Sequence, residues 1–378
     1  MATQMPLIHD ISAAVHPVLA KADVPGAAVA LTIDGRTASL GLGSRSPDLI
    51  HPLASDSQFY LYSVTKVLLA AATLRLVEQG RLRLDQPIGP FFPDLPLDAP
   101  ITLLHLLSHT SGLPDYGGIP EYHDDLKADP MIPWTTETFL ARTLPRGLLF
   151  RPGEGWAYSN IGFLLVRQVI ERVVGRPLRD VLSNLLFRPL DLQQTTVADS
   201  LDDARVLTSG YSTSLSQSGE LEDISRRYHP GWVSHGVAVS TAADVARLLE
   251  ALFNGDVIGP ATLAEMVVPR GAVGSHPTLG QIASGLGIFI GAGWKHGHLV
   301  GHGGGGPGYS TAAFHARDLA GHRVTAVALA NRDRDDIGHE LAFTLLDVAA
   351  RHLGHDRPGK TNGFRPSQSP NDAGGDTL

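Results

Sequence analysis

Ser63 and Lys66 have the spacing of a nucleophile and its base. They stand three positions apart at the start of a mostly apolar run, residues 63–79, so on a helix both side chains lie on one face, one turn apart. A serine hydroxyl is a poor nucleophile until a base takes its proton, and a buried lysine of lowered pKa can be that base. Backbone N–H groups at the start of such a helix can also stabilise an oxyanion. The same pair would serve equally well as a helix cap followed by a surface lysine.

Tyr158 and Asn160 form a second candidate pair. They follow the turn-forming residues 151–155 and precede the apolar run 161–170. A phenol can shuttle a proton, and an asparagine amide can hydrogen-bond both a base and a substrate carbonyl. The alternative interpretation is a buried tyrosine next to an asparagine that caps a helix.

The third candidate is the glycine-rich segment 301–308, GHGGGGPG. It matches the pattern G-x-G-x-x-G, but a dinucleotide-binding turn must lead from a strand into a helix, and here a second strand-like run begins at Tyr309. Glycines at the edge of a strand instead let a ligand approach the backbone and leave N–H groups available for an oxyanion. A flexible hairpin loop is the alternative.

Taken in order, Ser-x-x-Lys, Tyr-x-Asn and His-x-Gly resemble the serine β-lactamase and penicillin-recognising superfamily. The similarity is to its class C-like branch, which includes family VIII carboxylesterases, D-stereospecific aminopeptidases and related acyltransferases. Segments 106–114, 151–153 and 239–244 look familiar as well, and the resemblance covers about residues 8–353. It implies a two-lobed α/β fold with the site between the lobes, and a covalent acyl-enzyme.

The resemblance also implies roles for individual residues. Ser63 would be the nucleophile, Lys66 its activating partner, and Tyr158 the proton shuttle that also readies the deacylating water. Asn160 would bind substrate and orient Lys66. The backbone N–H groups of Ser63 and Gly305 would form the oxyanion hole.

One departure from the family pattern concerns the substrate. The family usually has Lys-Thr-Gly where this chain has His302-Gly303-Gly304, and by the resemblance His302 and Gly304 would contact the substrate. A histidine is largely neutral at pH 7, so a fixed cation is replaced by an uncharged group. We therefore expect a weaker grip on a substrate carboxylate, which favours esters, and amides without an anionic group at that end.

The predicted function is that of a serine hydrolase acting on small-molecule carboxylic esters or amides. A D-aminopeptidase or an acyltransferase could use the same site. A member of a different class, a non-catalytic ligand-binding module of β-lactamase-like fold, is disfavoured because Ser63, Lys66, Tyr158 and Asn160 are all present.

Two histidine groups raise the alternative of a metal site. His105 and His109 have the spacing of a metal pair on a helix, but lack the adjacent glutamate of a zinc hydrolase. His296, His298 and His302 could converge on a strand face, again without a neighbouring carboxylate. We expect structural histidines, no metal and no cofactor. A G-x-S-x-G elbow is absent from the sequence, which excludes an α/β-hydrolase nucleophile.

Hydrophobic periodicity places strands at both ends of the chain. Asp34-Gly35 between two apolar runs predicts a hairpin. The expected strands are 27–33, 37–42, 286–290, 298–300, 309–314 and 324–330, and the expected helices are 8–21, 63–79, one that ends near 254, and 336–353. This pattern favours an α/β (α+β) fold with one mixed, mainly antiparallel sheet built from both chain ends, flanked by helices, and a helical lobe beside it.

The expected domains follow from this arrangement. Residues 1–80 and 231–354 would form a discontinuous α/β lobe, and 81–230, short helical pieces broken by Pro and Gly, a helical lobe with the site in the cleft between them. The polar segment 355–378 is rich in Gly and Pro, which is typical of a disordered tail.

The amino-acid composition limits the kinds of partner and of chemistry that we expect for this protein. The 378 residues carry a net charge of -8 and only five lysines, which argues against nucleic acid. The zero cysteine count removes disulfides and thiolate chemistry. The sequence lacks an apolar run long enough for a bilayer, and the first 26 residues lack the pattern of a secretory signal. We expect a soluble cytoplasmic protein, unless a leader has been removed; the oligomeric state stays open.

Overall fold

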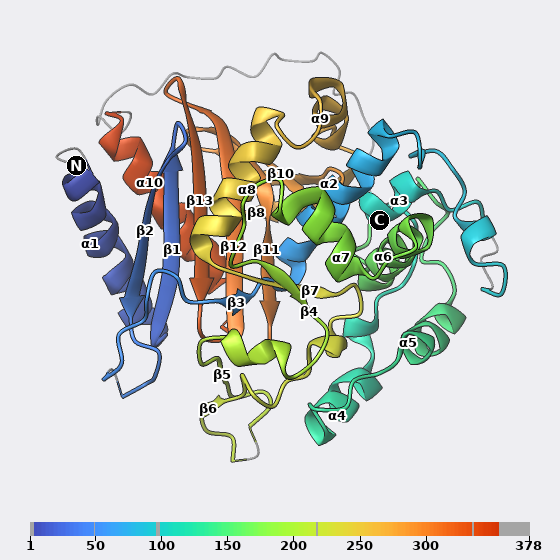
Figure 1. The fold of residues 1–378 in the computed structure, drawn as a ribbon, viewed down its shortest axis with the longest axis horizontal. Helices are drawn as coiled ribbons and strands as arrows, with labels where there is room; N and C mark the ends of the chain where they lie inside the picture. The colour runs from blue at the N-terminus through green and yellow to red at the C-terminus, as the bar shows by residue number, and fades with distance from the viewer. Residues whose placement is uncertain (1–3, 49, 96–98, 217, 335, 355–378) are drawn as a thin grey trace, which may run out of the picture.

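An eight-stranded sheet, contributed by both ends of the chain, organises the protein (Figure 1). The computed structural model describes residues 4–48, 50–95, 99–216, 218–334 and 336–354. The strand order is β2-β1-β13-β12-β11-β10-β9-β8, and each neighbouring pair is antiparallel. The strands are β1 (Gly26–Ile33), β2 (Arg36–Gly43), β8 (Gly271–His276), β9 (Gly280–Ser284), β10 (Phe289–Trp294), β11 (Gly297–Gly306), β12 (Tyr309–Leu319) and β13 (His322–Ala330). The predicted antiparallel sheet flanked by helices is confirmed.

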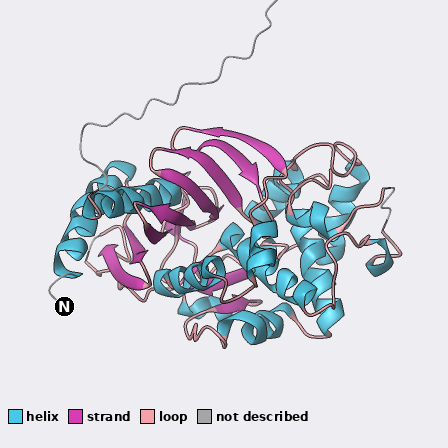
Figure 2. Cartoon of the chain, turned by 90° about the horizontal axis from the view of Figure 1, so that it is seen from above, coloured by secondary structure: helices cyan, strands magenta, loops and turns pink. Residues whose placement is uncertain are grey.

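Helices cover both faces of the part of this sheet formed by β1, β12 and β13 (Figure 2). On one face, α1 (Gln4–Ala22) and α10 (Ile337–His352) pack against each other, and α10 contacts β12 and β13; on the other, α8 (Ala242–Asn254) contacts β1 and β13. The central strands are buried on both faces because the apolar side chains of each face meet one of these layers. No helix within the described ranges is long and apolar enough to cross a membrane.

The remaining helices lie mostly beside the sheet, where Figure 1 shows them on the side of α2. They are α2 (Thr65–Glu78), α3 (Leu103–Leu107), α4 (Pro120–Ala128), α5 (Thr136–Thr143), α6 (Asn160–Val174), α7 (Leu178–Leu182) and α9 (Pro260–Met266). A three-stranded sheet of order β3-β7-β4 joins Phe59–Tyr60, Val237–Ser240 and Thr196–Ala198, and a two-stranded one pairs β5 (Tyr211–Ser212) with β6 (Glu222–Asp223). The division into two lobes stays a prediction.

Several elements differ from the expectation. Strands β4, β5 and β6 fall between 81 and 230, where the sequence predicted none, because two or three residues show no alternation. Strands β8 and β9 were also missed, since both are rich in glycine and polar residues. The glycine run is part of β11, so the expected strand 298–300 was too short. The predicted tail, 355–378, lies outside the described residues.

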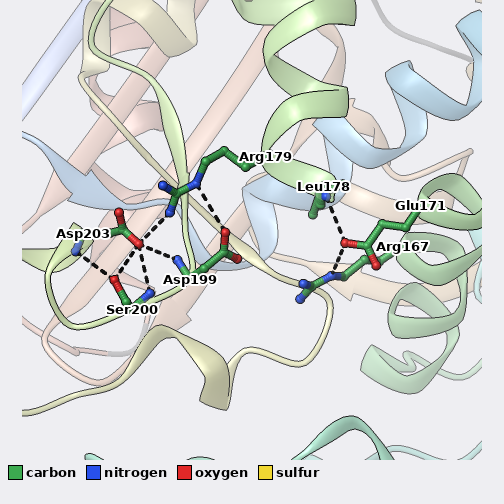
Figure 3. Close-up of polar contacts among 7 residues, drawn as sticks. All are labelled: Arg167, Glu171, Leu178, Arg179, Asp199, Ser200 and Asp203. Atoms are coloured by element: carbon green, nitrogen blue, oxygen red, sulfur yellow. Dashed lines mark hydrogen bonds and ion pairs between the residues drawn. The ribbon is translucent and has the colours of Figure 1, made fainter. Parts of the chain in front are cut away.

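Asp203 fastens α7 to the segment that follows β4 (Figure 3). Its Oδ2 accepts a 2.6 Å hydrogen bond from Nη2 of Arg179 on α7. The same oxygen accepts from the backbone N–H groups of Asp199 and Ser200, both at 3.0 Å, and from Ser200 Oγ at 2.8 Å. One carboxylate thus satisfies donors of a helix and of a turn.

Glu171 makes a comparable connection between α6 and α7 (Figure 3). Its Oε1 accepts from Arg167 Nε, one turn earlier on α6, at 3.2 Å, and from the backbone N–H of Leu178 at 2.9 Å. That N–H belongs to the first residue of α7 and would otherwise lack a helical partner. The carboxylate of Glu171 thus ties the start of α7 to α6, and that of Asp203 ties α7 to the segment after β4.

We predict that Asp203→Ala lowers the free energy of unfolding by about 1–3 kcal/mol, because Arg179 loses one of its two carboxylate partners and two backbone N–H groups lose their acceptor. Urea denaturation measures the change. Asp202→Ala is the matched control: its carboxylate pairs with Arg205 on the surface, with both side chains at least 75% exposed, so its effect stays within about 0.5 kcal/mol. Equal losses in the two variants would contradict the assignment.

Candidate active site

Ser63 lies on a tight turn that leads into α2. It is the middle residue of a short 3-10 helix, Tyr62–Val64. Tyr62 has a φ of +46°, a left-handed conformation that few non-glycine residues adopt. Its hydroxyl donates to the carbonyl of Pro307 in the turn after β11. The backbone of Ser63 is thereby held against the glycine-rich end of that strand.

Lys66 and Tyr158 both reach the hydroxyl of Ser63. Lys66, in the first turn of α2, is fully buried, and its Nζ lies 3.0 Å from Ser63 Oγ. The Tyr158 hydroxyl donates to the same Oγ at 2.7 Å. One oxygen atom therefore contacts an amine and a phenol, the two groups that the sequence singled out.

Burial shifts the pKa values of Lys66 and Tyr158 in opposite directions, and in each case it favours the neutral form. Desolvation lowers the pKa of Lys66 well below its usual value, and the charge of Asp115 opposes this only in part. Desolvation likewise raises the pKa of Tyr158, against a smaller opposing effect of its bond to Ser63. The arrangement favours an amine that can accept a proton beside a phenol that keeps its own.

Asn160 joins this group as the first residue of α6. Its Oδ1 accepts from Lys66 Nζ at 2.8 Å. The carboxylate of Asp115 accepts from both its backbone N–H, at 2.7 Å, and its Nδ2, at 3.2 Å. Because the amide nitrogen is bound by Asp115, the amide oxygen must face Lys66.

The backbone before Asn160 is positioned by His109. Its Nδ1 accepts from the backbone N–H of Ser159 at 3.1 Å, and its ring packs on that of Tyr158 with centroids 4.4 Å apart. His109 follows the end of α3, whereas His105 lies within α3 and caps it by accepting from the Thr102 backbone N–H. The two histidines have separate structural tasks and are not neighbours on one helix.

The structure also separates the other histidine group that was weighed as a metal site. His302 is buried, whereas His298 is exposed. Throughout the described part of the chain, no cluster of three or more His, Cys, Asp or Glu side chains has the arrangement of a metal site.

The glycines of β11 permit a close approach to the nucleophile turn. A Cβ on Gly304 would lie 2.3 Å from the Leu61 carbonyl oxygen and 3.1 Å from the Ser63 nitrogen. A Cβ on Gly306 would lie 2.4 Å from the ring of Tyr62. At Gly305 the space is open. Gly304 and Gly306 therefore pack against the turn, whereas the side-chain position of Gly305 between them meets no other atom.

His302 is a neutral group in this site. Burial, aided by the nearby Lys66, lowers its pKa to about 3. Its ring lies against Phe289 of β10, with centroids 4.6 Å apart. A substrate that contacts His302 thus meets an uncharged imidazole across the physiological pH range.

A cavity of about 1070 Å³ opens on these residues. Ser63, Tyr158 and residues 302–307 form its reactive side. Part of α4, residues 213–215 and the segment after β13, including Asp333 and Arg334, also line the cavity. Its size suits a small molecule.

Comparison with known proteins agrees with this geometry. A family model described as Beta-lactamase matches residues 11–350. The chain belongs to the beta-lactamase family. The resemblance expected from the three motifs is thereby confirmed.

Two curated relatives and one solved structure illustrate the range of this family. Penicillin-binding protein 4* of Bacillus subtilis (strain 168) is 30% identical over 301 residues, 75% of this chain and 63% of its own length. Esterase EstB of Burkholderia gladioli is 35% identical over 156 residues, 38% of this chain and 39% of its own. The chain spans less than two thirds of either. The D-amino acid amidase of Ochrobactrum anthropi SV3, complexed with L-phenylalanine amide, has a TM-score of 0.76 at 26% identity, covering 93% of this chain and 98% of that one.

Sequence reasoning missed Asp115 and His235. Asp115 directly follows the family-like segment 106–114, so extending that segment by one residue would have found it. His235 Nε2 lies 3.3 Å from Lys66 Nζ, yet 169 residues separate the two and no spacing connects them. Only the folded chain identifies this contact.

Asp115→Asn should lower the pKa of Lys66 further, because it removes a negative charge that favours the ammonium form. The reactivity of Ser63 toward a fluorophosphonate, followed by intact mass spectrometry, rises with pH as Lys66 loses its proton. In the variant this rise moves to lower pH. A rise that stays in place or moves to higher pH would show that Asp115 does not act on the amine.

Gly304→Ala and Gly305→Ala form a matched pair. The first places a methyl group 2.3 Å from the Leu61 carbonyl, while the second meets nothing within 4 Å. We expect Gly304→Ala to slow labelling of Ser63 by about 100-fold, as misplaced reacting groups do. Gly305→Ala retains its backbone N–H and stays within a few-fold of the parent protein. Comparable rates for the two variants would exclude a tight approach of β11 to the turn.

Proposed function

We propose that this member of the beta-lactamase family is a serine hydrolase that cleaves small-molecule esters or amides through an acyl-enzyme on Ser63. The supporting observation is that Ser63 Oγ, at the wall of the cavity, contacts both Lys66 Nζ and the Tyr158 hydroxyl. An activated nucleophile needs a base within hydrogen-bond reach, and the base needs its own orienting partner. Asn160 is that partner for Lys66.

Acylation begins as neutral Lys66 takes the Ser63 proton and Oγ bonds to the substrate carbonyl carbon. The carbonyl electrons move onto oxygen, where the backbone N–H groups of Ser63 and Gly305 receive the charge. The tetrahedral intermediate collapses, and its bond to the alcohol or amine breaks. Tyr158 protonates the leaving group, and the proton held by Lys66 replaces the one that Tyr158 gave.

Deacylation reverses these roles. Tyr158 orients a water molecule, and neutral Lys66 takes one of its protons as the water oxygen bonds to the acyl carbonyl carbon. The tetrahedral intermediate collapses, the bond between that carbon and Ser63 Oγ breaks, and the carboxylic acid leaves. Lys66 returns its proton to Oγ, which lies 3.0 Å away. An alcohol or amine in the place of water would turn the same acyl-enzyme into an acyl-transfer intermediate. Water is the acceptor in the reaction proposed here.

The neutral site near Ser63 favours substrates without an anionic group beside the scissile bond. His302 supplies no charge there, since its pKa is lowered to about 3. The names of Esterase EstB and of the D-amino acid amidase indicate that esters and amides are both handled by similar proteins. We infer that p-nitrophenyl esters and amino acid amides react better than a β-lactam, whose carboxylate meets no cation at His302.

Covalent labelling combined with a substrate panel tests the proposal. A fluorophosphonate should add once to the parent protein and not to Ser63→Ala, and that variant should lose turnover of p-nitrophenyl esters, nitrocefin and D-alanyl amides by about 1,000-fold or more. Ser310→Ala is the control, because Ser310 also lines the cavity but binds the backbone N–H of Gly338. Equal turnover by the parent protein and Ser63→Ala would refute a covalent serine mechanism.

A further inference from the structure

His235 makes a third contact with the amine of Lys66. It lies just before β7, is 1% exposed, and points its Nε2 at Lys66 Nζ over 3.3 Å. The other contacts of this amine are Ser63 Oγ at 3.0 Å and Asn160 Oδ1 at 2.8 Å. Nζ is therefore surrounded by a hydroxyl, an amide oxygen and an imidazole nitrogen, all of them uncharged groups.

The surroundings of His235 keep its ring neutral. Burial is the main effect that holds the pKa of His235 well below its usual value, and repulsion from Arg167 and from Lys66 and His302 in their protonated forms acts in the same direction. The backbone of Tyr62 acts in the opposite sense and favours the protonated ring, as a carbonyl facing a ring N–H does. Nδ1 has no hydrogen-bond partner among the described residues, and Lys66 in its ammonium form can only donate to Nε2, so that contact favours the tautomer with the proton on Nδ1.

One further neighbour of the ring is apolar. Phe163 of α6 lies edge-on to it, with centroids 6.5 Å apart. With Nδ1 protonated, Nε2 carries a lone pair, and its neighbour Lys66 Nζ has hydrogens to donate. The direction of the hydrogen bond is then from the lysine to the histidine.

The three neighbours match the needs of a neutral amine. Such an amine has two N–H donors and one lone pair. Asn160 Oδ1 and His235 Nε2 accept the two hydrogens, which leaves the lone pair for the hydroxyl proton of Ser63. If His235 could not accept, one N–H of a fully buried amine would lack a partner, and the lone pair could turn away from the serine.

We propose that His235 is a positioning residue, which accepts a hydrogen bond from Lys66 through Nε2 and so directs the lone pair of the amine toward Ser63. The inference rests on the function proposed above. It assigns no contact between His235 and the substrate, and His235 keeps its proton throughout.

The test compares His235→Leu with His235→Gln. An acceptor stabilises an ammonium more than an amine, so its loss in His235→Leu should lower the pKa of Lys66 by about one unit. Since the base must be neutral to act, the rise of kcat/KM with pH should move to lower pH by the same amount. We also expect kcat/KM for a p-nitrophenyl ester to fall about 10- to 100-fold. His235→Gln retains an amide oxygen of similar reach and should restore both properties in large part.

Nuclear magnetic resonance of ¹³Cε-labelled lysine gives a second measurement that does not depend on turnover. The chain has five lysines, so the spectrum is simple, and Lys66→Met assigns the signal of interest. His315→Gln is the control for changing a buried histidine, because His315 binds Thr325 on the sheet and should leave the Lys66 titration unchanged. Thermal unfolding establishes that each variant is folded.

The sign of the shift decides the outcome. A Lys66 pKa that rises in His235→Leu would mean that Nε2 donates to the amine, and an unchanged value would mean that His235 only fills space; either result overturns the proposal. Should His235→Leu fail to fold, His235→Asn takes its place, since its shorter amide stops short of Nζ and predicts the same downward shift. If Ser63→Ala keeps full turnover while the titration shifts, the proposed function fails and the contact stands. If instead Ser63→Ala loses turnover and the Lys66 titration does not shift in His235→Leu, the proposed function stands and only the role of His235 is refuted.

Discussion

The burial of one amine determines how the rest of the site must be built. Lys66 lies in α2, whose side chains are buried on nearly every side, and an ammonium in such a place loses its hydration without gaining a carboxylate contact. The negative charge of Asp115 favours the ammonium form, but it acts from behind Asn160, whose amide it binds. Neutral partners keep the amine available as a base and still satisfy its hydrogens. A direct ion pair would have made the same lysine a permanent cation.

The site draws its parts from segments that the fold alone brings together. Ser63 lies on the 3-10 turn before α2 and Lys66 in α2, Tyr158 and Asn160 lie at the start of α6, and the glycine edge belongs to β11. The contact between the Ser63 turn and β11 depends on the lack of a Cβ at Gly304, where there is room for a hydrogen atom only. The same logic explains why a costly glycine run stands in the centre of a sheet.

The sequence predicted the parts of this site that depend on local spacing. Ser63 and Lys66 are one helical turn apart, and Tyr158 and Asn160 flank the cap of α6, so short-range geometry already constrains them. The glycines were expected at a strand edge, but the length of β11 was not, because pairing with β12 rather than side-chain alternation carries the strand through them. Asp115 adjoins a segment that the sequence did single out, whereas the contact of His235 with Lys66 depends on a loop whose path no pattern of residues reveals. The short strands β4, β5 and β6 were not predicted either, because they are defined by pairing with other segments of the chain and not by a pattern of their own.

Some of the residues that line the cavity make no described hydrogen bond to the reactive groups Ser63 and Lys66. Part of α4 and residues 213–215 line the cavity, whereas the described hydrogen bonds to Ser63 and Lys66 come from Tyr158, Asn160, His235 and each other. Mutations that accumulate in the wall can therefore alter which acyl groups fit without disturbing proton transfer. A lineage of such proteins could drift between preferred compounds while its reactive centre stays fixed.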